Sequence, residues 1–128
     1  MAEIKPAKQP RRGEIWYVKL QSDPPDKGGR PVVVVSMEAR NAHERATTVL
    51  VVPLSTTPAR MASRISLSKG ETGLSEESTI QAEGITTIRK ESLQEPKQSL
   101  RRLSDNLIER VAKGVVIALG FPDLIKSR

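Results

Sequence analysis

The sequence contains no cysteine and only one histidine, His43. A disulfide, a thiolate nucleophile and a Cys-ligated zinc site are therefore excluded, and one histidine cannot build a His-rich metal site. We accordingly expect no bound metal and no cofactor. Tryptophan, tyrosine and phenylalanine occur once each, so aliphatic side chains must fill the interior.

Long apolar runs are also missing. No stretch approaches the roughly 20 residues that cross a bilayer as a helix. Residues 1–12 lack the apolar core of a secretory signal. We therefore expect a cytoplasmic protein with no membrane partner.

Positive charge is present in excess. The 21 Lys and Arg residues outnumber the 15 Asp and Glu residues, which gives a formal net charge of +6 at pH 7. This balance favours a polyanionic partner such as a nucleic acid, although many small soluble proteins are basic without binding one. At 128 residues the chain has the length of one domain.

Short apolar runs predict a body rich in β-strands. Alternation over residues 13–20 indicates a half-buried strand, and the β-branched run 32–35 indicates a strand buried on both faces. The other expected elements are strands at 47–54, 65–67, 78–82 and 85–88, the last two interrupted at Glu83-Gly84, loops at 21–29, 55–64 and 69–77, and a helical turn within 37–45. The prolines and lysines of residues 1–11 predict a flexible basic tail.

One long helix is expected over residues 105–119. Ser104 is a good N-cap, Gly120 supplies a left-handed C-terminal position and Pro122 prevents continuation. Gly114 lowers helix propensity, which suggests a close neighbour there. The apolar stripe consists of Leu107, Val111 and Val115, with Ile108, Ala112 and Leu119 beside it. Short strands followed by a packed terminal helix predict an α+β domain.

Three polar side chains stand where apolar strands begin or end. Arg30 follows Gly28-Gly29, and a guanidinium held at such a turn presents a rigid fork suited to phosphate. Ser55 and Thr56 follow the strand at 47–54 and could contact a phosphate or a 2′-OH. The alternative interpretations are an ordinary loop arginine and hydroxyls that only cap a turn.

Two further titratable residues are candidates for chemistry. Glu83 lies among Thr, Ile, Gln and Ala residues, and it could act as a general base if burial raised its pKa. The alternative is a solvated strand face. His43 lies in the most polar segment of the chain, which indicates a surface histidine, and the sequence does not support a Ser-His-Asp hydrolase.

Several short motifs occur in one order: Arg12-Gly13-Glu14-Ile15-Trp16, residues 29–36 (GRPVVVVS), residues 51–55 (VVPLS), Gly73-Leu74 with Ser78, residues 88–93 and the helix end at Leu119-Gly120. Together they resemble the MazF/PemK family over about residues 11–120. The resemblance implies a small antiparallel β-barrel of the PemK/CcdB-like kind with a C-terminal helix. This barrel domain would span residues 12–120, between the basic tail 1–11 and a short C-terminal tail, 121–128.

The resemblance also implies a function. It indicates a growth-inhibiting toxin, active as a homodimer, that cuts single-stranded RNA (mRNA) at specific sequences, without metal, by attack of the 2′-OH. It further implies neutralisation by an acidic antitoxin and contact with DNA through the antitoxin complex. The alternative is a non-catalytic toxin of the same fold, either a nucleic-acid-binding protein or a gyrase poison.

Residue by residue, the resemblance assigns catalysis to Arg30, Ser55 and Glu83. Arg30 matches the family's catalytic arginine, Ser55 stands where the family usually has threonine, and Glu83 stands at an acidic position. The segment after Glu83 reads Gly84-Ile85-Thr86-Thr87, so the Gln and Arg of the family pattern are missing. We expect RNA contacts from Gly28, Gly29, Lys27, Thr56, Arg12 and Trp16. The Trp16 indole could stack on a base, and the alternative is that it belongs to the core.

Overall fold

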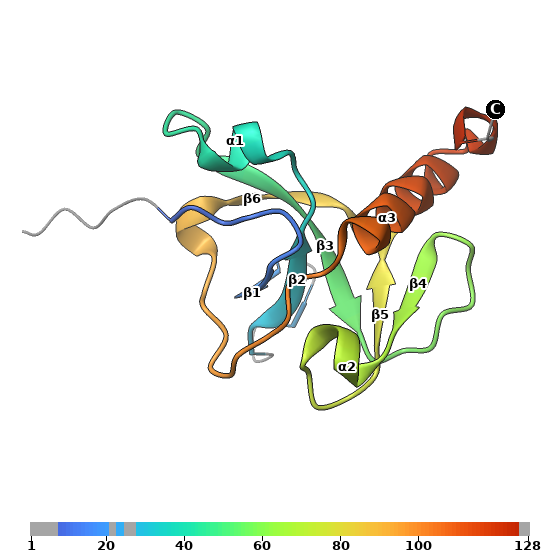
Figure 1. The fold of residues 1–128 in the computed structure, drawn as a ribbon, viewed down its shortest axis with the longest axis horizontal. Helices are drawn as coiled ribbons and strands as arrows, with labels where there is room; N and C mark the ends of the chain where they lie inside the picture. The colour runs from blue at the N-terminus through green and yellow to red at the C-terminus, as the bar shows by residue number, and fades with distance from the viewer. Residues whose placement is uncertain (1–7, 21–22, 25–27, 126–128) are drawn as a thin grey trace, which may run out of the picture.

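The fold combines one antiparallel sheet with a C-terminal helix (Figure 1). The computed structural model describes residues 8–20, 23–24 and 28–125. The strands are β1 (Ile15–Val18), β2 (Arg30–Val34), β3 (Thr48–Ser55), β4 (Arg64–Leu67), β5 (Ser78–Gln81) and β6 (Thr86–Arg89). The helices are α1 (Glu38–Ala42), α2 (Lys69–Thr72) and α3 (Asp105–Ala118), and the 3₁₀ turns are η1 (Ala82–Gly84), η2 (Lys90–Ser92) and η3 (Pro122–Ile125). The predicted α+β class is confirmed.

Strand β3 is the centre of the sheet. Strand β2 pairs with β3, and Val33 lies opposite Val52. Strand β6 also pairs with β3, along its first half, and β5 pairs with the end of β3. The full order is β1-β2-β3-β5-β4, with β6 beside β3. The turn η1 separates β5 from β6, so the predicted interruption at Glu83-Gly84 is confirmed.

The core has two parts, one on each face of β2 and β3. Neighbouring residues of a strand point to opposite faces, so Val33 and Val52 belong to one cluster, while Val32 and Val51 belong to the other. Both clusters are aliphatic among their fully buried members, and Trp16 packs against the second from its edge. The prediction of a strand buried on both faces is confirmed for residues 32–34.

The chain after β6 returns to the outer edge of β1. Tyr17 and Gln94 exchange two backbone hydrogen bonds there, of 2.9 and 2.8 Å. Among the described residues this is an isolated bridge, and the named strands form an open path rather than a continuous ring of paired strands. The predicted antiparallel sheet with a terminal helix is therefore observed, and continuous barrel pairing is not seen in this part of the chain.

Helix α3 packs on η1 and β4. The Ser104 hydroxyl accepts a hydrogen bond from the Leu107 N–H at 3.3 Å, and Gly120 has φ of +86°, so both predicted ends of the helix are confirmed. Of the predicted apolar stripe, Leu107, Ile108 and Val111 are buried, whereas Ala112 and Leu119 are exposed, so the buried face of α3 is narrower than predicted.

Two other segments can be compared with the sequence-based predictions, residues 69–77 and the N-terminal tail. The predicted loop 69–77 contains the helical turn α2, because Ser68 and Glu71 form a capping box. Of the predicted tail 1–11, residues 8–11 lie within the described chain, and the Lys8 ammonium donates hydrogen bonds to the carbonyls of Glu91 and Leu93. No helix of the described residues is long and apolar enough to cross a membrane.

Candidate active site

Arg30 is the first residue of β2, and it lies opposite Val18 of β1. The two glycines before it fall within the described residues, and neither has a positive φ. A Cβ added at Gly29 would instead lie 3.4 Å from Gln94 Oε1 and 3.5 Å from Tyr17 Cβ. These are ordinary contact distances, so Gly29 lies against β1 without a close approach that requires glycine, and it does not form the sharp left-handed turn that a Gly-Gly pair allows.

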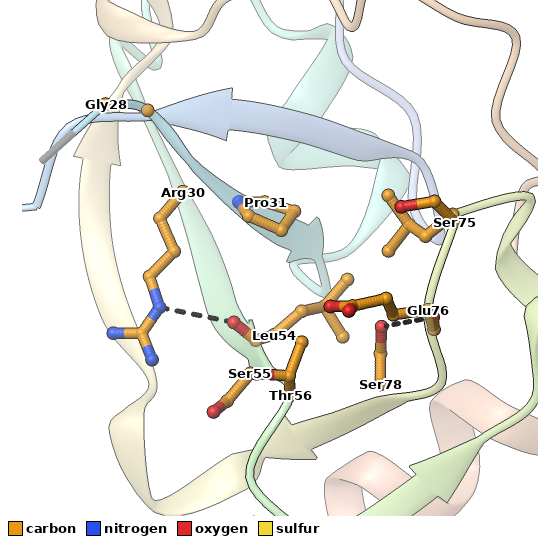
Figure 2. Close-up of a pocket in the computed structure, with 11 residues that line it drawn as sticks. Gly28, Arg30, Pro31, Leu54, Ser55, Thr56, Ser75, Glu76 and Ser78 are labelled. Carbon is orange, nitrogen blue, oxygen red and sulfur yellow. Dashed lines mark hydrogen bonds between the residues drawn. The ribbon is translucent and has the colours of Figure 1, made fainter.

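Three acceptors hold the Arg30 guanidinium. Its Nε donates to the Leu54 carbonyl at 3.2 Å, Nη1 to Asp23 Oδ1 at 3.3 Å and Nη2 to Gln81 Oε1 at 3.4 Å (Figure 2 shows the Leu54 bond). The acceptors come from β3, from the loop between β1 and β2, and from β5. Contacts from three separate segments fix the orientation of the side chain.

Arg30 still has hydrogen bonds to offer. A guanidinium carries five N–H donors, and the described residues accept from three of them, which leaves one on each terminal nitrogen without a partner among those residues. Two donors on a planar fork can bind two oxygens of one phosphate. Asp23 balances part of the charge, and its side chain is only 8% exposed, so Arg30 is oriented by a carboxylate that solvent barely reaches.

The residue lies at one side of a cavity of about 310 Å³. Ser55 and Thr56, at the end of β3, contribute to its lining, and so do Gly28 and Gly29 (Figure 2). The remaining lining residues are Pro31, Leu54, Leu74, Ser75, Glu76 and Ser78. The structure thus brings together five of the nine predicted site residues: Gly28, Gly29, Arg30, Ser55 and Thr56.

Ser55 has a local role as well as a place in the cavity. Its Oγ accepts a hydrogen bond from the Thr57 N–H at 3.1 Å, which is the turn contact expected of a serine at a strand end. That bond uses the oxygen as an acceptor. The hydroxyl proton is left to donate to a ligand oxygen.

Glu83 is not among the residues that line this cavity. Its carboxylate accepts hydrogen bonds from Ser63 Oγ at 3.0 Å and Arg64 Nε at 2.9 Å, which ties η1 to the start of β4. Burial raises the pKa of Glu83, but the hydrogen bonds from Arg64, its own backbone and Ser63, with the Arg64 charge, outweigh burial and leave the pKa below its ordinary value. The structure therefore does not bring the Glu83 carboxylate into this cavity with Arg30, and Arg64 engages it instead.

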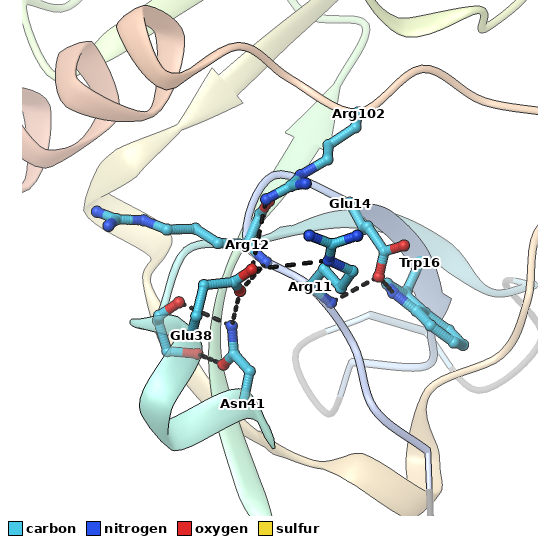
Figure 3. A network of polar contacts seen from close by, with 8 residues as sticks. Arg11, Arg12, Glu14, Trp16, Glu38, Asn41 and Arg102 are labelled. Carbon is cyan, nitrogen blue, oxygen red and sulfur yellow. Dashed lines mark hydrogen bonds and ion pairs between the residues drawn. The ribbon is translucent and has the colours of Figure 1, made fainter. Parts of the chain in front are cut away.

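Arg12 and Trp16 belong to a different surface (Figure 3). The Arg12 backbone N–H donates to Glu38 Oε1 at 2.6 Å, and this bond is the largest cause of the lowered pKa of Glu38. Trp16 Nε1 donates to Glu14 Oε1 at 3.2 Å, and the indole borders a separate hollow. Lys27 lies outside the described residues. His43 is exposed, as predicted.

Asp23, Gln81 and Glu76 are site residues that sequence reasoning missed. Asp23 and Gln81 reach Arg30 from segments that are 7 and 51 positions away in the chain, and no local pattern signals such contacts. Glu76 lies within the motif formed by Gly73-Leu74 and Ser78. That motif was the sequence signal that could have identified Glu76 as a site residue. Among the described residues, no three His, Cys, Asp or Glu side chains gather to hold a metal ion.

The profile of one protein family matches residues 11–119: PemK-like, MazF-like toxin of type II toxin–antitoxin system. An endoribonuclease MazF from Staphylococcus saprophyticus is 28% identical over 113 residues, which cover 87% of this chain and 92% of the relative. A solved endoribonuclease from a mycobacterial species superposes with a TM-score of 0.69 at 23% identity, covering 90% of this chain and 95% of that one. MazF from Deinococcus radiodurans (Form-I) gives 0.67 at 15% identity, covering 88% and 98%. These superpositions show a shared fold.

Proposed function

Because the chain belongs to the PemK-like, MazF-like toxins of type II toxin–antitoxin systems, we propose that it is an endoribonuclease that cuts single-stranded RNA at specific sequences without a metal ion. The observation that carries the proposal is the Arg30 guanidinium, which three acceptors hold at the side of an open cavity and which has two donors that no described residue engages. The similarity to an endoribonuclease MazF over most of both chains supports it.

The chemistry assigned to this cavity is attack of a 2′-OH on the adjacent phosphate. The O2′–P bond forms, the P–O5′ bond breaks, and the products carry a 2′,3′-cyclic phosphate and a 5′-OH. Negative charge grows on the two non-bridging oxygens, and the free donors of Arg30 stabilise it there. The Ser55 hydroxyl donates to the same phosphate or to the 2′-OH, and Thr56 contacts the neighbouring nucleotide.

A single-stranded substrate suits the shape of the site. The cavity is open and small, so the phosphate and ribose must enter with the flanking bases splayed apart, which unpaired RNA permits. Gly28 and Gly29 present backbone without side chains at its rim, so a strand can approach closely. Arg12 and Trp16 lie on the other surface, so we propose that they contact nucleotides farther from the cleaved bond. Lys27 is the remaining residue that we propose to contact RNA.

The proposed partners are an acidic antitoxin and a second copy of the chain, with DNA bound through the antitoxin complex. A solved mycobacterial relative was crystallised with its cognate antitoxin, and the net charge of +6 favours an acidic segment here. The exposed Leu119, Phe121 and Leu124, at 66, 60 and 74%, offer apolar surface to a homodimer. We propose a cytoplasmic toxin whose working domain is residues 12–120.

The deciding experiment incubates purified protein with a mixed pool of unstructured RNA in excess EDTA and sequences the ends. We expect cuts at a short common sequence and cyclic phosphate ends. Arg30→Lys keeps a positive charge beside Asp23 but loses the planar fork, so it should fold and fail to cut. Arg110→Lys, on the exposed face of α3, is the matched control. RNA that is bound and left intact by the wild-type protein would favour the non-catalytic alternative.

A further inference from the structure

The proposed reaction needs a group that accepts the 2′-OH proton. Two carboxylates near the cavity are already engaged. Asp23 is paired with Arg30, and its second oxygen, Oδ2, is buried without a hydrogen-bond partner among the described residues, so substrate cannot reach it. Glu83 is paired with Arg64 and lies outside the cavity lining.

Glu76 is the carboxylate that lines the cavity itself. It lies on the segment between α2 and β5, and Figure 2 shows its side chain directed into the cavity from the wall that faces Arg30. Its backbone carbonyl accepts a hydrogen bond from Ser78 Oγ at 3.4 Å, while no described residue forms a hydrogen bond or ion pair with its carboxylate. A base must be reachable and unpaired before substrate arrives, and Glu76 meets both conditions.

We infer that Glu76 is the catalytic base of the site, an inference that rests on the proposed ribonuclease function. With the scissile phosphate bound to the free donors of Arg30, the ribose 2′-OH faces the opposite wall. The Glu76 carboxylate takes the 2′-OH proton as the O2′–P bond forms, and the leaving O5′ takes a proton from water. Glu76 then returns its proton to solvent, so the enzyme is unchanged after each cut.

The placement of Arg30 and Glu76 on facing walls gives each a separate task. A cation against the phosphoryl oxygens lowers the cost of the charge that develops there, and a carboxylate against the 2′-OH removes the proton. The two groups are not ion-paired with each other: the described partner of Arg30 is Asp23. Each side chain is therefore available to the substrate rather than neutralised by the other.

Glu76→Gln tests the inference, with Glu77→Gln as the matched control. Both substitutions remove one negative charge from neighbouring exposed positions, and Glu77 is absent from the cavity lining. For Glu76→Gln we expect kcat to fall about 10²- to 10⁴-fold, the usual contribution of a positioned base, with loss of the acidic limb of the pH–rate profile. Glu76→Asp should recover part of the rate, and Glu77→Gln should cleave within about twofold of wild type.

Affinity separates a base from a binding residue. RNA with a 2′-deoxy residue at the cut site cannot react, and it should bind Glu76→Gln as well as or better than wild type, because a negative charge near the phosphates has gone. The inference is overturned if Glu76→Gln cleaves like Glu77→Gln, or if it changes the sequence that is cut while the maximal rate and pH profile stay the same. A wild-type protein that cuts no RNA would instead refute the proposed function.

Discussion

Arg64 contacts a single carboxylate oxygen of Glu83 with two of its nitrogens, Nε and Nη2, each 2.9 Å from Oε2. The pair joins the first residue of β4 to η1, and both side chains are mostly buried. Helix α3 packs on both of these elements, so the ion pair joins two segments that the helix also contacts. It is a structural contact, and its energetics can be tested by pH.

The first prediction concerns stability as a function of pH. The pKa of Glu83 is lower in the folded protein than in the unfolded chain, so the ionised carboxylate stabilises the fold. That contribution is present above the unfolded pKa and is lost as pH falls through the lowered folded pKa. Glu83→Gln should therefore reduce the free energy of unfolding at pH 7 by about 1–3 kcal/mol, with a smaller difference from wild type in acid. Urea unfolding at several pH values measures both.

A matched control for that prediction is Glu91→Gln. Glu91 is paired with Arg89 at 3.2 Å, but the two side chains are 72 and 70% exposed. Exposed pairs contribute little, so the change should be well under about 1 kcal/mol. Glu83→Gln should also keep RNA cleavage, and a rate loss like that of Arg30→Lys would return Glu83 to the catalytic machinery.

The second prediction concerns Gly114. A Cβ at this position would lie 2.9 Å from both Ala82 Cβ and the Ser63 carbonyl oxygen, so α3 could not keep its distance from η1. Gly114→Ala should lower the free energy of unfolding by about 1–3 kcal/mol through overpacking, despite the roughly 1 kcal/mol that alanine gains in a free helix. Gly70→Ala, whose Cβ would meet only Ser68 Oγ at 3.9 Å, should be neutral or stabilising. Equal effects of the two substitutions would contradict the packing argument.

The sequence predicted the strands, the split at Glu83-Gly84 and the ends of α3, because these depend on local signals: β-branched runs, an N-cap and a left-handed glycine. It also predicted that Gly114 has a close neighbour. The sequence did not predict contacts between side chains from distant segments. In the sequence Glu83 has no evident partner, but the fold places Arg64 of β4 beside it.

The candidate site also contains some residues that the sequence identified and others that it did not. Gly28, Gly29, Arg30, Ser55 and Thr56 line one cavity, because β2 and β3 are antiparallel neighbours and the start of one lies beside the end of the other. The supporting acceptors Asp23 and Gln81 could not be predicted, since their contacts with Arg30 arise from the path of a loop and from the β3–β5 pairing. Such contacts depend on how distant segments are placed by the fold, which local sequence patterns do not predict.

The third prediction tests the hydroxyl at the end of β3. Ser55→Ala removes a donor that can reach the phosphate, and cleavage should slow by about 10- to 1000-fold, the range for one positioned transition-state contact. Ser55→Thr retains the hydroxyl and should cleave well. Thr56→Ala, at the adjacent residue that is proposed to contact the next nucleotide, should slow cleavage less than Ser55→Ala. If Thr56→Ala were the more damaging substitution, the contact would belong to Thr56 instead.

The last prediction tests whether the acceptors around Arg30 set its orientation. Gln81→Leu removes the Oε1 acceptor that lies 3.4 Å from Arg30 Nη2, and kcat/KM should fall about tenfold, equivalent to ~1.4 kcal/mol. Gln98→Leu, at an exposed position outside the cavity, should cleave like wild type. If Gln81 acts through Arg30, Gln81→Leu should leave the affinity for RNA with a 2′-deoxy cut site unchanged in an Arg30→Ala background, because effects within one contact network are not additive. An equal loss of affinity in the wild-type and Arg30→Ala backgrounds would show that Gln81 contacts the RNA itself.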